Sequence, residues 1–241
     1  MGTSAFALFI CTILGVSVAV ALARVLVIAA SLGLWFWTQW LLSRRNPATT
    51  DGAVVGGEIC DGIHNMTARI NARLNRLPGR ANALLISSSM VIDLLGLYLL
   101  GSAIFGPTIQ PFLGLLMLFA LRQLCQAFCP LPPPKGMIWR DTGVPTLLVT
   151  YGTSCDLFFS GHTAIAVYGA ATLAAALGPW GIWLGLAIAF FEIGVVLLLR
   201  AHYTMDVFAG LITALYVHRL AIDWAPAVDR WIAHVVRFAG H

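Results

Sequence analysis

Residues 161–199 have the sequence GHTAIAVYGAATLAAALGPWGIWLGLAIAFFEIGVVLLL, in which Glu192 is the one charged side chain. An α-helix needs about 20 apolar residues to cross the hydrocarbon core of a bilayer, so this stretch is long enough for two crossings. The breaker-rich sequence Gly178-Pro179-Trp180-Gly181 divides it near its middle. We therefore expect a hairpin of two transmembrane helices over residues 161–177 and 182–199.

The composition of the whole chain indicates a lipid-embedded protein. Only 10% of the 241 residues are charged, 59% are hydrophobic, and the mean hydropathy is +0.87. Soluble domains carry about 25% charged residues, so a water-soluble protein is excluded. Other apolar blocks predict spans near residues 83–101, 111–128 and 203–222.

The first apolar block, residues 4–42, contains Arg24 but no comparable turn. It predicts one long or kinked span, followed by an interfacial stretch that contains Trp35, Trp37 and Trp40. The expected fold is therefore an all-α polytopic membrane protein with about six transmembrane helices, and a count of seven stays open.

Residues 43–80 form a long polar stretch with six arginines. Five apolar residues recur in it at helical spacing: Ile63, Met66, Ile70, Leu74 and Leu77. Asp61 precedes them as a candidate N-cap. This pattern predicts an amphipathic interfacial helix whose arginines reach lipid phosphates. A solvated loop helix whose charges mark the cytoplasmic side is an equally supported alternative.

The expected organisation has three parts. Residues 1–80 supply an N-terminal span and the amphipathic interfacial segment. Residues 81–222 form the catalytic transmembrane core, and residues 223–241 form a C-terminal tail.

Two polar clusters interrupt the apolar pattern where spans begin. The sequence DLFFSGHT occupies residues 156–163, and RAHYTMD occupies residues 200–206. The chain crosses the membrane and returns once between them, so both clusters reach the same side. Ionisable residues at a membrane are costly and by default mark functional sites. The two clusters therefore predict one shared site.

The residue types in these clusters are suited to phosphoryl transfer. His202 and Asp206 are four residues apart, so on one helix the carboxylate can orient the imidazole as a nucleophile. His162 begins a helix whose N–H groups favour a bound phosphate, and it can protonate a departing alkoxide. Ser160 and Arg200 are candidate phosphate contacts. Either histidine alone would favour a structural role, whereas their joint occurrence favours a phosphohistidine mechanism that needs no metal or cofactor.

The same residues carry a family resemblance. SGHT at 160–163 and HYTMD at 202–206 resemble motifs of the lipid phosphate phosphatase/phosphotransferase superfamily, and more narrowly of its sphingomyelin synthase-like branch. Arg122 followed by LPPPKGM at 131–137 is similar to a third motif of that branch. The general phosphatase branch carries Lys-x6-Arg-Pro, not found here, and an arginine six residues before the second histidine, where this chain has Val196. These differences favour the synthase-like branch.

The resemblance spans about residues 111–222 and implies a six-helix membrane enzyme. It implies a catalytic triad of His162, His202 and Asp206, with His202 as the nucleophile, and a headgroup contact from Arg122. The implied partners are a phospholipid headgroup donor and a lipid alcohol acceptor, ceramide or diacylglycerol. With water as the acceptor, the enzyme would be phospholipase C-like. No nucleic-acid partner is expected.

Two alternative functions stay open at this point. One is a lipid phosphate phosphatase that acts on phosphatidate or a polyprenyl diphosphate. The other is a small transporter or channel that uses the two histidines as a proton relay, although no inverted repeat is evident.

Four further residues have expected roles. Asp156 and Tyr203 belong to the clusters and are expected on the substrate-binding side of the site. Glu192 could face an internal cavity and select a cationic headgroup, or be a protonated structural group. His64 is expected to be an ordinary surface histidine.

The distribution of Lys and Arg bears on sidedness. Six arginines of residues 43–80 with Lys135, Arg140 and Arg200 make nine on the side of both clusters, against Arg219, Arg230 and Arg237 on the other. The positive-inside rule would put the site in the cytoplasm. The resemblance implies a bacterial inner membrane with the site facing outward, and we follow it because an interfacial arginine helix can violate the rule.

Overall fold

The protein folds as a set of helices. The computed structural model describes residues 16–44, 59–129, 131–149 and 157–239, and within these ranges the regular structure is entirely helical. The long helices are α2 (Val18–Ser43), α5 (Pro78–Phe105), α6 (Gln110–Phe128), α7 (Gly161–Leu177), α8 (Pro179–Leu198) and α9 (Thr204–Ala239). Two short helices, α3 (Gly62–Met66) and α4 (Ala68–Arg76), lie between α2 and α5.

The helix lengths confirm an all-α polytopic membrane protein. Among the described residues, five helices are long and apolar enough to cross a bilayer: α2, α5, α6, α8 and α9. Helix α7 is apolar but has 17 residues, at the lower end of the length that can cross. With α7 included, the expected count of about six corresponds to these six helices.

The helices begin and end where the local sequence requires it. Ser17 and Ser160 cap α2 and α7, accepting hydrogen bonds from the N–H groups of Val20 and Thr163. Proline stands in the first turn of α5, α6 and α8, where its missing N–H costs nothing. Gly178, with φ +57°, forms the tight turn between α7 and α8, so the expected hairpin is present.

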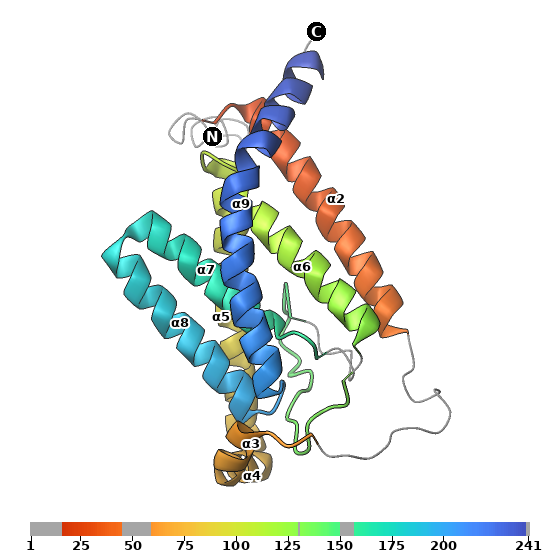
Figure 1. The fold of residues 1–241 in the computed structure, drawn as a ribbon, viewed down its shortest axis with the longest axis vertical. Helices are drawn as coiled ribbons and strands as arrows, with labels where there is room; N and C mark the ends of the chain where they lie inside the picture. The colour runs from red at the N-terminus through yellow and green to blue at the C-terminus, as the bar shows by residue number, and fades with distance from the viewer. Residues whose placement is uncertain (1–15, 45–58, 130, 150–156, 240–241) are drawn as a thin grey trace.

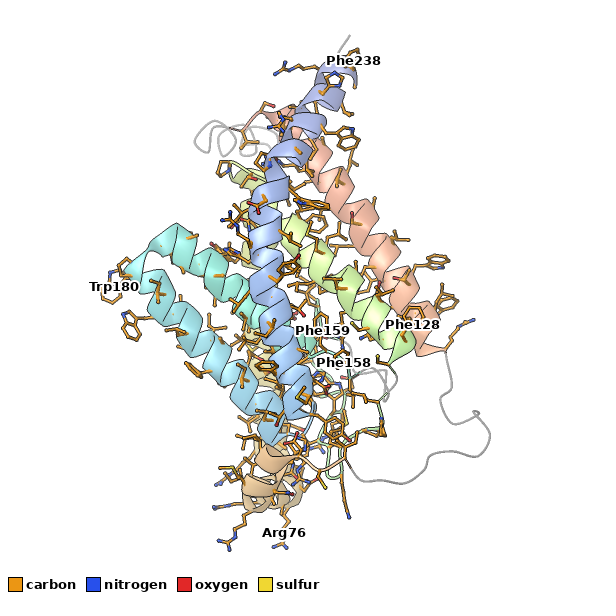
Figure 2. The ribbon with its side chains drawn as sticks, viewed as in Figure 1. Arg76, Phe128, Phe158, Phe159, Trp180 and Phe238 are labelled. Carbon is orange, nitrogen blue, oxygen red and sulfur yellow. The ribbon has the colours of Figure 1, made fainter. Side chains whose placement is uncertain are left out.

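The helices are arranged around α9, which runs along the long axis of the molecule (Figure 1). The α7–α8 hairpin lies on one side of α9, and α6 and α2 lie on the other. Helices α3 and α4 form one end of the molecule, near the end of α8 and the start of α9. The start of α2 and the C-terminal part of α9 lie at the opposite end. The side chains of Arg76 and Phe238 mark these two ends (Figure 2).

Helix α2 differs from the expectation of a span followed by an interfacial stretch. It is continuous from Val18 to Ser43 and includes all three tryptophans. Trp37 and Trp40 are exposed on its outer face, whereas Trp35 is buried and stacks on Phe119 of α6, with ring centroids 4.5 Å apart. Beyond Ser31 and Gly33 the helix packs on α6 through Trp35 and through Thr38, whose hydroxyl donates a 2.9 Å hydrogen bond to Gln123.

The amphipathic segment forms two helices instead of one. Asp61 caps α3 as expected, and a break at Thr67 separates α3 from α4. Leu74 packs against Ala81 and Leu85 at the start of α5. Met66, Ile70 and Leu77 are exposed, so the expected apolar stripe is divided: Leu74 faces the protein and these three residues face away from it.

Residues 223–239, expected as a tail, continue α9 without a break. Pro226 lies inside this helix, and beyond it Asp229 accepts a 2.7 Å hydrogen bond from buried Arg24 of α2. The C-terminal part of α9 is thereby anchored to the transmembrane helices.

Candidate active site

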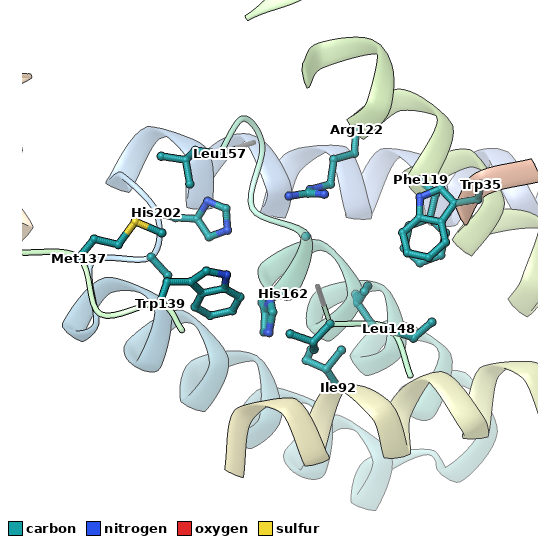
Figure 3. A pocket seen from close by; sticks show the side chains of 14 residues that line it. Trp35, Ile92, Phe119, Arg122, Met137, Trp139, Leu148, Leu157, His162 and His202 are labelled. Atoms are coloured by element: carbon teal, nitrogen blue, oxygen red, sulfur yellow. The ribbon is translucent and has the colours of Figure 1, made fainter. Parts of the chain in front are cut away.

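The two polar clusters meet at a cavity formed by several helices. His162 lies at the start of α7, His202 in the link between α8 and α9, and Arg122 near the end of α6; all three line the cavity. Figure 3 shows the guanidinium of Arg122 reaching from α6 towards His202. The rest of the lining is mostly apolar: Trp35, Ile92, Phe119, Met137, Trp139, Leu148, Val149, Leu157, Gly161, Ile165 and Ala201.

His202 and Asp206 are held by the beginning of α9. Asp206 is completely buried, and its Oδ2 accepts a 2.9 Å hydrogen bond from the N–H of Tyr203 just before the helix. This bond is one half of a capping box, in which an acid at the third helical position binds the N–H of the cap residue. The same Oδ2 lies 3.7 Å from Nδ1 of His202, and that nitrogen has no hydrogen-bond partner among the residues that the structure describes. The carboxylate therefore faces one ring nitrogen of His202 and leaves Nε2 for chemistry.

His162 is the second residue of α7 and is buried. The edge of its ring meets Trp139, with ring centroids 5.2 Å apart. Its Nε2 is buried and has no hydrogen-bond partner within the described part of the chain, so this nitrogen could exchange a proton with a bound substrate. The free N–H groups and the dipole at the start of α7 add a preference for an anion beside it.

Arg122 brings a positive charge to the start of α7. Its Nε donates a 3.0 Å hydrogen bond to the carbonyl of Phe159. A Cβ at Gly161 would lie 3.1 Å from this Nε, so a larger residue there would require the guanidinium to shift by a few tenths of an ångström. Gly210 of α9 similarly allows close packing on the carbonyl of Ser160, which fixes α9 against the start of α7. The result is a cationic group and a helix N-terminus at one point.

Four other candidate residues lie outside the cavity lining. Ser160 is fully buried as the N-cap of α7. Arg200 donates to the carbonyls of Lys135 (2.5 Å) and His64 (2.9 Å). Its positive φ of 54° turns the α8–α9 link. The hydroxyl of Tyr203 donates to the carbonyl of Pro132 at 3.2 Å.

Glu192 is the fourth of these residues. It is completely buried in α8, where its Oε2 lies 2.6 Å from the hydroxyl of Ser88 on α5. Asp156 falls outside the residues that the structure describes.

Two residues near His202 were not predicted as part of the site. His64, expected on the surface, is buried, and its Nε2 lies 3.0 Å from the carbonyl of His202. Asp61 caps α3 and also accepts hydrogen bonds from the N–H (2.7 Å) and the hydroxyl (2.8 Å) of Thr204. In the sequence only Asp61 is recognisable, as an aspartate at a helix start. The sequence does not indicate its contact with Thr204, which lies 143 residues away.

The surroundings of Asp61 and Tyr203 set their ionisation. Burial alone would raise the pKa of Asp61, but hydrogen bonds from Thr204 and His64 outweigh it and hold the pKa below its ordinary value. Burial raises the pKa of Tyr203, and the nearby carboxylates of Asp206 and Asp61 raise it further. Asp61 therefore accepts hydrogen bonds as an anion, and Tyr203 donates as a neutral phenol.

The geometry brings His202, the expected nucleophile, His162, the expected proton donor, and the cationic Arg122 to one cavity. Transfer from a phosphate ester through a histidine uses groups of these three kinds. Residues 154–222 match the family described as PAP2 superfamily C-terminal. The match includes His162, His202 and Asp206, while Arg122, Trp35 and Asp61 lie before it. No curated protein and no solved structure gives a significant match to the chain.

The PAP2 match supports the resemblance to the lipid phosphate phosphatase superfamily, although not its sphingomyelin synthase-like branch. It supports an enzyme with phosphatase or phosphotransferase activity on lipid phosphates. The helices independently indicate a multi-pass membrane protein.

Proposed function

We propose that this protein is a membrane-embedded enzyme that transfers phosphorus groups from lipid phosphates through a phosphohistidine on His202. The observation that carries the proposal is the convergence of His162, His202 and Arg122 on one cavity at the N-terminus of α7. Each group has a separate task there, because the bond to be broken needs an attacking nitrogen, a proton and a counter-charge.

The first step forms the phosphohistidine. Nε2 of His202 attacks phosphorus, and the bond between phosphorus and the lipid oxygen breaks. His162 gives its proton to the departing oxygen, so the leaving lipid is a neutral alcohol. Asp206 stabilises the cationic phosphohistidine through Nδ1, while Arg122 and the N-terminus of α7 balance the phosphate charge.

The second step regenerates the enzyme. His162 removes a proton from an acceptor hydroxyl, whose oxygen attacks phosphorus as the bond to Nε2 breaks. Water as the acceptor gives hydrolysis, and a lipid alcohol gives transfer. His202 returns to its neutral form and His162 regains its proton, so the cycle closes.

For the substrate, we propose a phospholipid whose diacylglycerol–phosphate bond is cleaved, with transfer of the phospho-headgroup to ceramide, another lipid alcohol or water. The absence of a Lys-x6-Arg-Pro sequence favours this reaction. The second candidate is a lipid phosphate phosphatase acting on phosphatidate or a polyprenyl diphosphate, and the family match favours it.

We also propose that the site faces outward from a bacterial inner membrane. The exposed, polar Asn65 of α3 lies at the end of the molecule that holds the start of α9. An Asn65→Cys variant in intact cells should react with a membrane-impermeant maleimide, as measured by mass spectrometry of the peptide. Labelling only after cell lysis would assign the site to the cytoplasm.

The activity test uses purified protein in detergent with labelled phosphatidylcholine, phosphatidylethanolamine and phosphatidate, each with and without ceramide. Diacylglycerol from the first two lipids supports headgroup transfer or phospholipase C-like hydrolysis. Inorganic phosphate from phosphatidate alone assigns the phosphatase. Ion flux in vesicles without lipid turnover would exclude both enzymatic functions and identify the protein as a channel.

The nucleophile is tested with His202→Ala, which should abolish lipid turnover and the formation of the acid-labile phosphohistidine. His218→Ala is a matched control, because His218 lies on α9 against the ring of Tyr168 and not in the cavity. Full turnover by His202→Ala would exclude the mechanism.

A further inference from the structure

The link between α8 and α9 carries the proposed nucleophile, yet it contains few residues to hold it in place. It runs from Leu199 to Tyr203, and its backbone turns sharply at Arg200. The N–H groups of Leu199, Arg200 and Ala201 donate to carbonyls at the end of α8, and the N–H of Tyr203 donates to Asp206. Among the described residues, the backbone of His202 itself makes no hydrogen bond to another backbone group. The position of His202 therefore depends on groups outside the link.

Helix α3 supplies one of these groups directly at His202. The ring of His64 is buried, and its Nε2 lies 3.0 Å from the backbone carbonyl of His202. With the proton on Nε2, this is a hydrogen bond from His64 to the residue that carries the nucleophile. The carbonyl of His64 in turn accepts from the guanidinium of Arg200 at 2.9 Å. These two hydrogen bonds join α3 to the α8–α9 link, one at Arg200 and one at His202.

Asp61 supplies a second attachment, at the start of α9. Its Oδ1 accepts from the N–H groups of Ile63 and His64, which starts α3. Its Oδ2 accepts from the N–H of Thr204, the first residue of α9, at 2.7 Å. The N–H groups in the first turn of a helix have no partner within the helix, so one carboxylate here caps two helices. This fixes the distance between α3 and the turn that carries Asp206.

We propose that Asp61 and His64 are positioning residues for the catalytic pair: they hold the backbone of His202 and the start of α9, and thereby aim the imidazole at the cavity. Neither residue lines the cavity or touches the substrate. The proposal rests on the proposed function in assigning His202 as the nucleophile. It adds that a segment 138 residues earlier in the chain, outside the family match, sets its geometry.

The first test compares four variants with a control in α3. His64→Ala removes the hydrogen bond to the His202 carbonyl, whereas His64→Gln keeps an N–H donor. Asp61→Ala removes both caps, whereas Asp61→Asn keeps one acceptor oxygen. Asn65→Ala is the control, because Asn65 is exposed and adjoins His64.

We expect His64→Ala and Asp61→Ala to lower kcat by about 100-fold, the effect of misplacing a reacting group by about 1 Å. KM should stay near the wild-type value, because substrate binding is unaffected. His64→Gln should recover most of the lost kcat, and Asn65→Ala should match the wild type. Equal losses in His64→Ala and His64→Gln, or a loss confined to KM, would overturn the proposal.

The second test needs no activity. Amide hydrogen exchange of the peptide covering residues 199–206 should rise by about tenfold in His64→Ala and Asp61→Ala, the effect of one lost hydrogen bond. Exchange in the C-terminal part of α9, at the opposite end of the molecule from α3, should not change, which shows that the variants are folded. Unchanged exchange in the 199–206 peptide would overturn the proposal.

The two tests separate the present proposal from the proposed function. If wild-type protein turns over no lipid, the function fails, while the exchange result still decides whether α3 holds the link. If exchange rises but kcat is unchanged, α3 holds the link without positioning the nucleophile, and the proposal is wrong.

Discussion

The carboxylate of Asp206 faces two groups, the N–H of Tyr203 and the imidazole of His202, which interact with different properties of it. The N–H of Tyr203 needs a hydrogen-bond acceptor, which a neutral amide can also supply. A cationic imidazole at His202 needs a negative charge, which an amide cannot supply. Stability and catalysis should therefore respond differently to one substitution.

We predict that Asp206→Asn lowers kcat by at least about 100-fold while it shifts the melting temperature only slightly. In the Ser-His-Asp proteases, the corresponding change from acid to amide costs about 10⁴-fold. Lipid turnover and thermal unfolding in detergent measure the two effects. Asp206→Ala, which also removes the acceptor, should lower both. A normal kcat in Asp206→Asn would mean that the charge has no catalytic role.

The space at Gly161 gives a second prediction at this scale. An alanine Cβ there would lie 3.1 Å from Nε of Arg122 and push the guanidinium away from the start of α7. We expect Gly161→Ala to lower kcat by about tenfold, a modest displacement of a charged group. The melting temperature should hold or rise, because alanine favours a helix over glycine. Turnover and thermal unfolding are the measurements.

Gly79→Ala is the matched control, since Gly79 also lies in the first turn of a helix and a Cβ there meets nothing within 4 Å. It should leave kcat unchanged. A similar loss in both variants would contradict a specific role for the space beside Arg122.

The site could be predicted from the sequence only where its residues are close along the chain. His202 and Asp206 are neighbours by helical spacing, so their pairing follows from the sequence. His162 could be joined to them because the two clusters sit at the two ends of one hairpin. Arg200 was expected at the phosphate, yet its guanidinium binds two backbone carbonyls. These carbonyls belong to Lys135 and His64, 65 and 136 residues earlier in the chain, so the sequence does not indicate that they lie beside Arg200.

At the scale of the elements, α4 presents arginines and apolar side chains to its surroundings together. Arg69, Arg73 and Arg76 are exposed, as is Ile70. The inner face of the helix is polar as well as apolar, because buried Asn71 donates to the carbonyls of Gly136 and Leu198. The exposed stripe is therefore free to enter the lipid headgroup layer, which agrees with an interfacial helix.

We predict that a spin label at Ile70→Cys of α4 is accessible to oxygen but not to a water-soluble nickel chelate in bilayers that contain anionic lipid. Replacing Arg69, Arg73 and Arg76 with glutamine should reverse this, since each arginine contributes about 1 kcal/mol of attraction to such a surface. Electron paramagnetic resonance measures both accessibilities. The same number of substitutions at Arg219, Arg230 and Arg237 of α9 is the control. Nickel access in the unsubstituted chain would identify α4 as a solvated loop helix.

The elements themselves were predicted well where breakers stand in the sequence. Gly178 and Pro179 divide the α7–α8 hairpin as expected. Residues 223–239 look like a tail because their composition turns polar, but they continue α9. Helix continuation there depends on Asp229, whose partner Arg24 lies 205 residues earlier. Local patterns carry no information about such a contact.

At the scale of the whole molecule, Arg24 and Asp229 form a polar cluster far from the cavity. Arg24 is buried and donates to the carbonyls of Ala103 (3.2 Å) and Gly106 (2.7 Å) as well as to Asp229. Asp229 also accepts from the hydroxyl of Thr108 at 2.6 Å. The cluster thereby joins α2, the turn between α5 and α6, and α9. Trp35, where α2 reaches the cavity, lies 11 residues or about 16 Å further along the helix.

This cluster should control stability without affecting the chemistry. Asp229→Ala leaves Arg24 buried without its counter-charge, so we predict a loss of about 3–5 kcal/mol in the free energy of unfolding. The double variant Arg24→Met/Asp229→Leu removes both charges and should recover part of that loss. Thermal unfolding in detergent measures stability, and kcat below the melting temperature should equal that of the wild type. A fall in kcat without a fall in stability would show that the cluster communicates with the cavity, since α2 and α5 each contribute a residue to both.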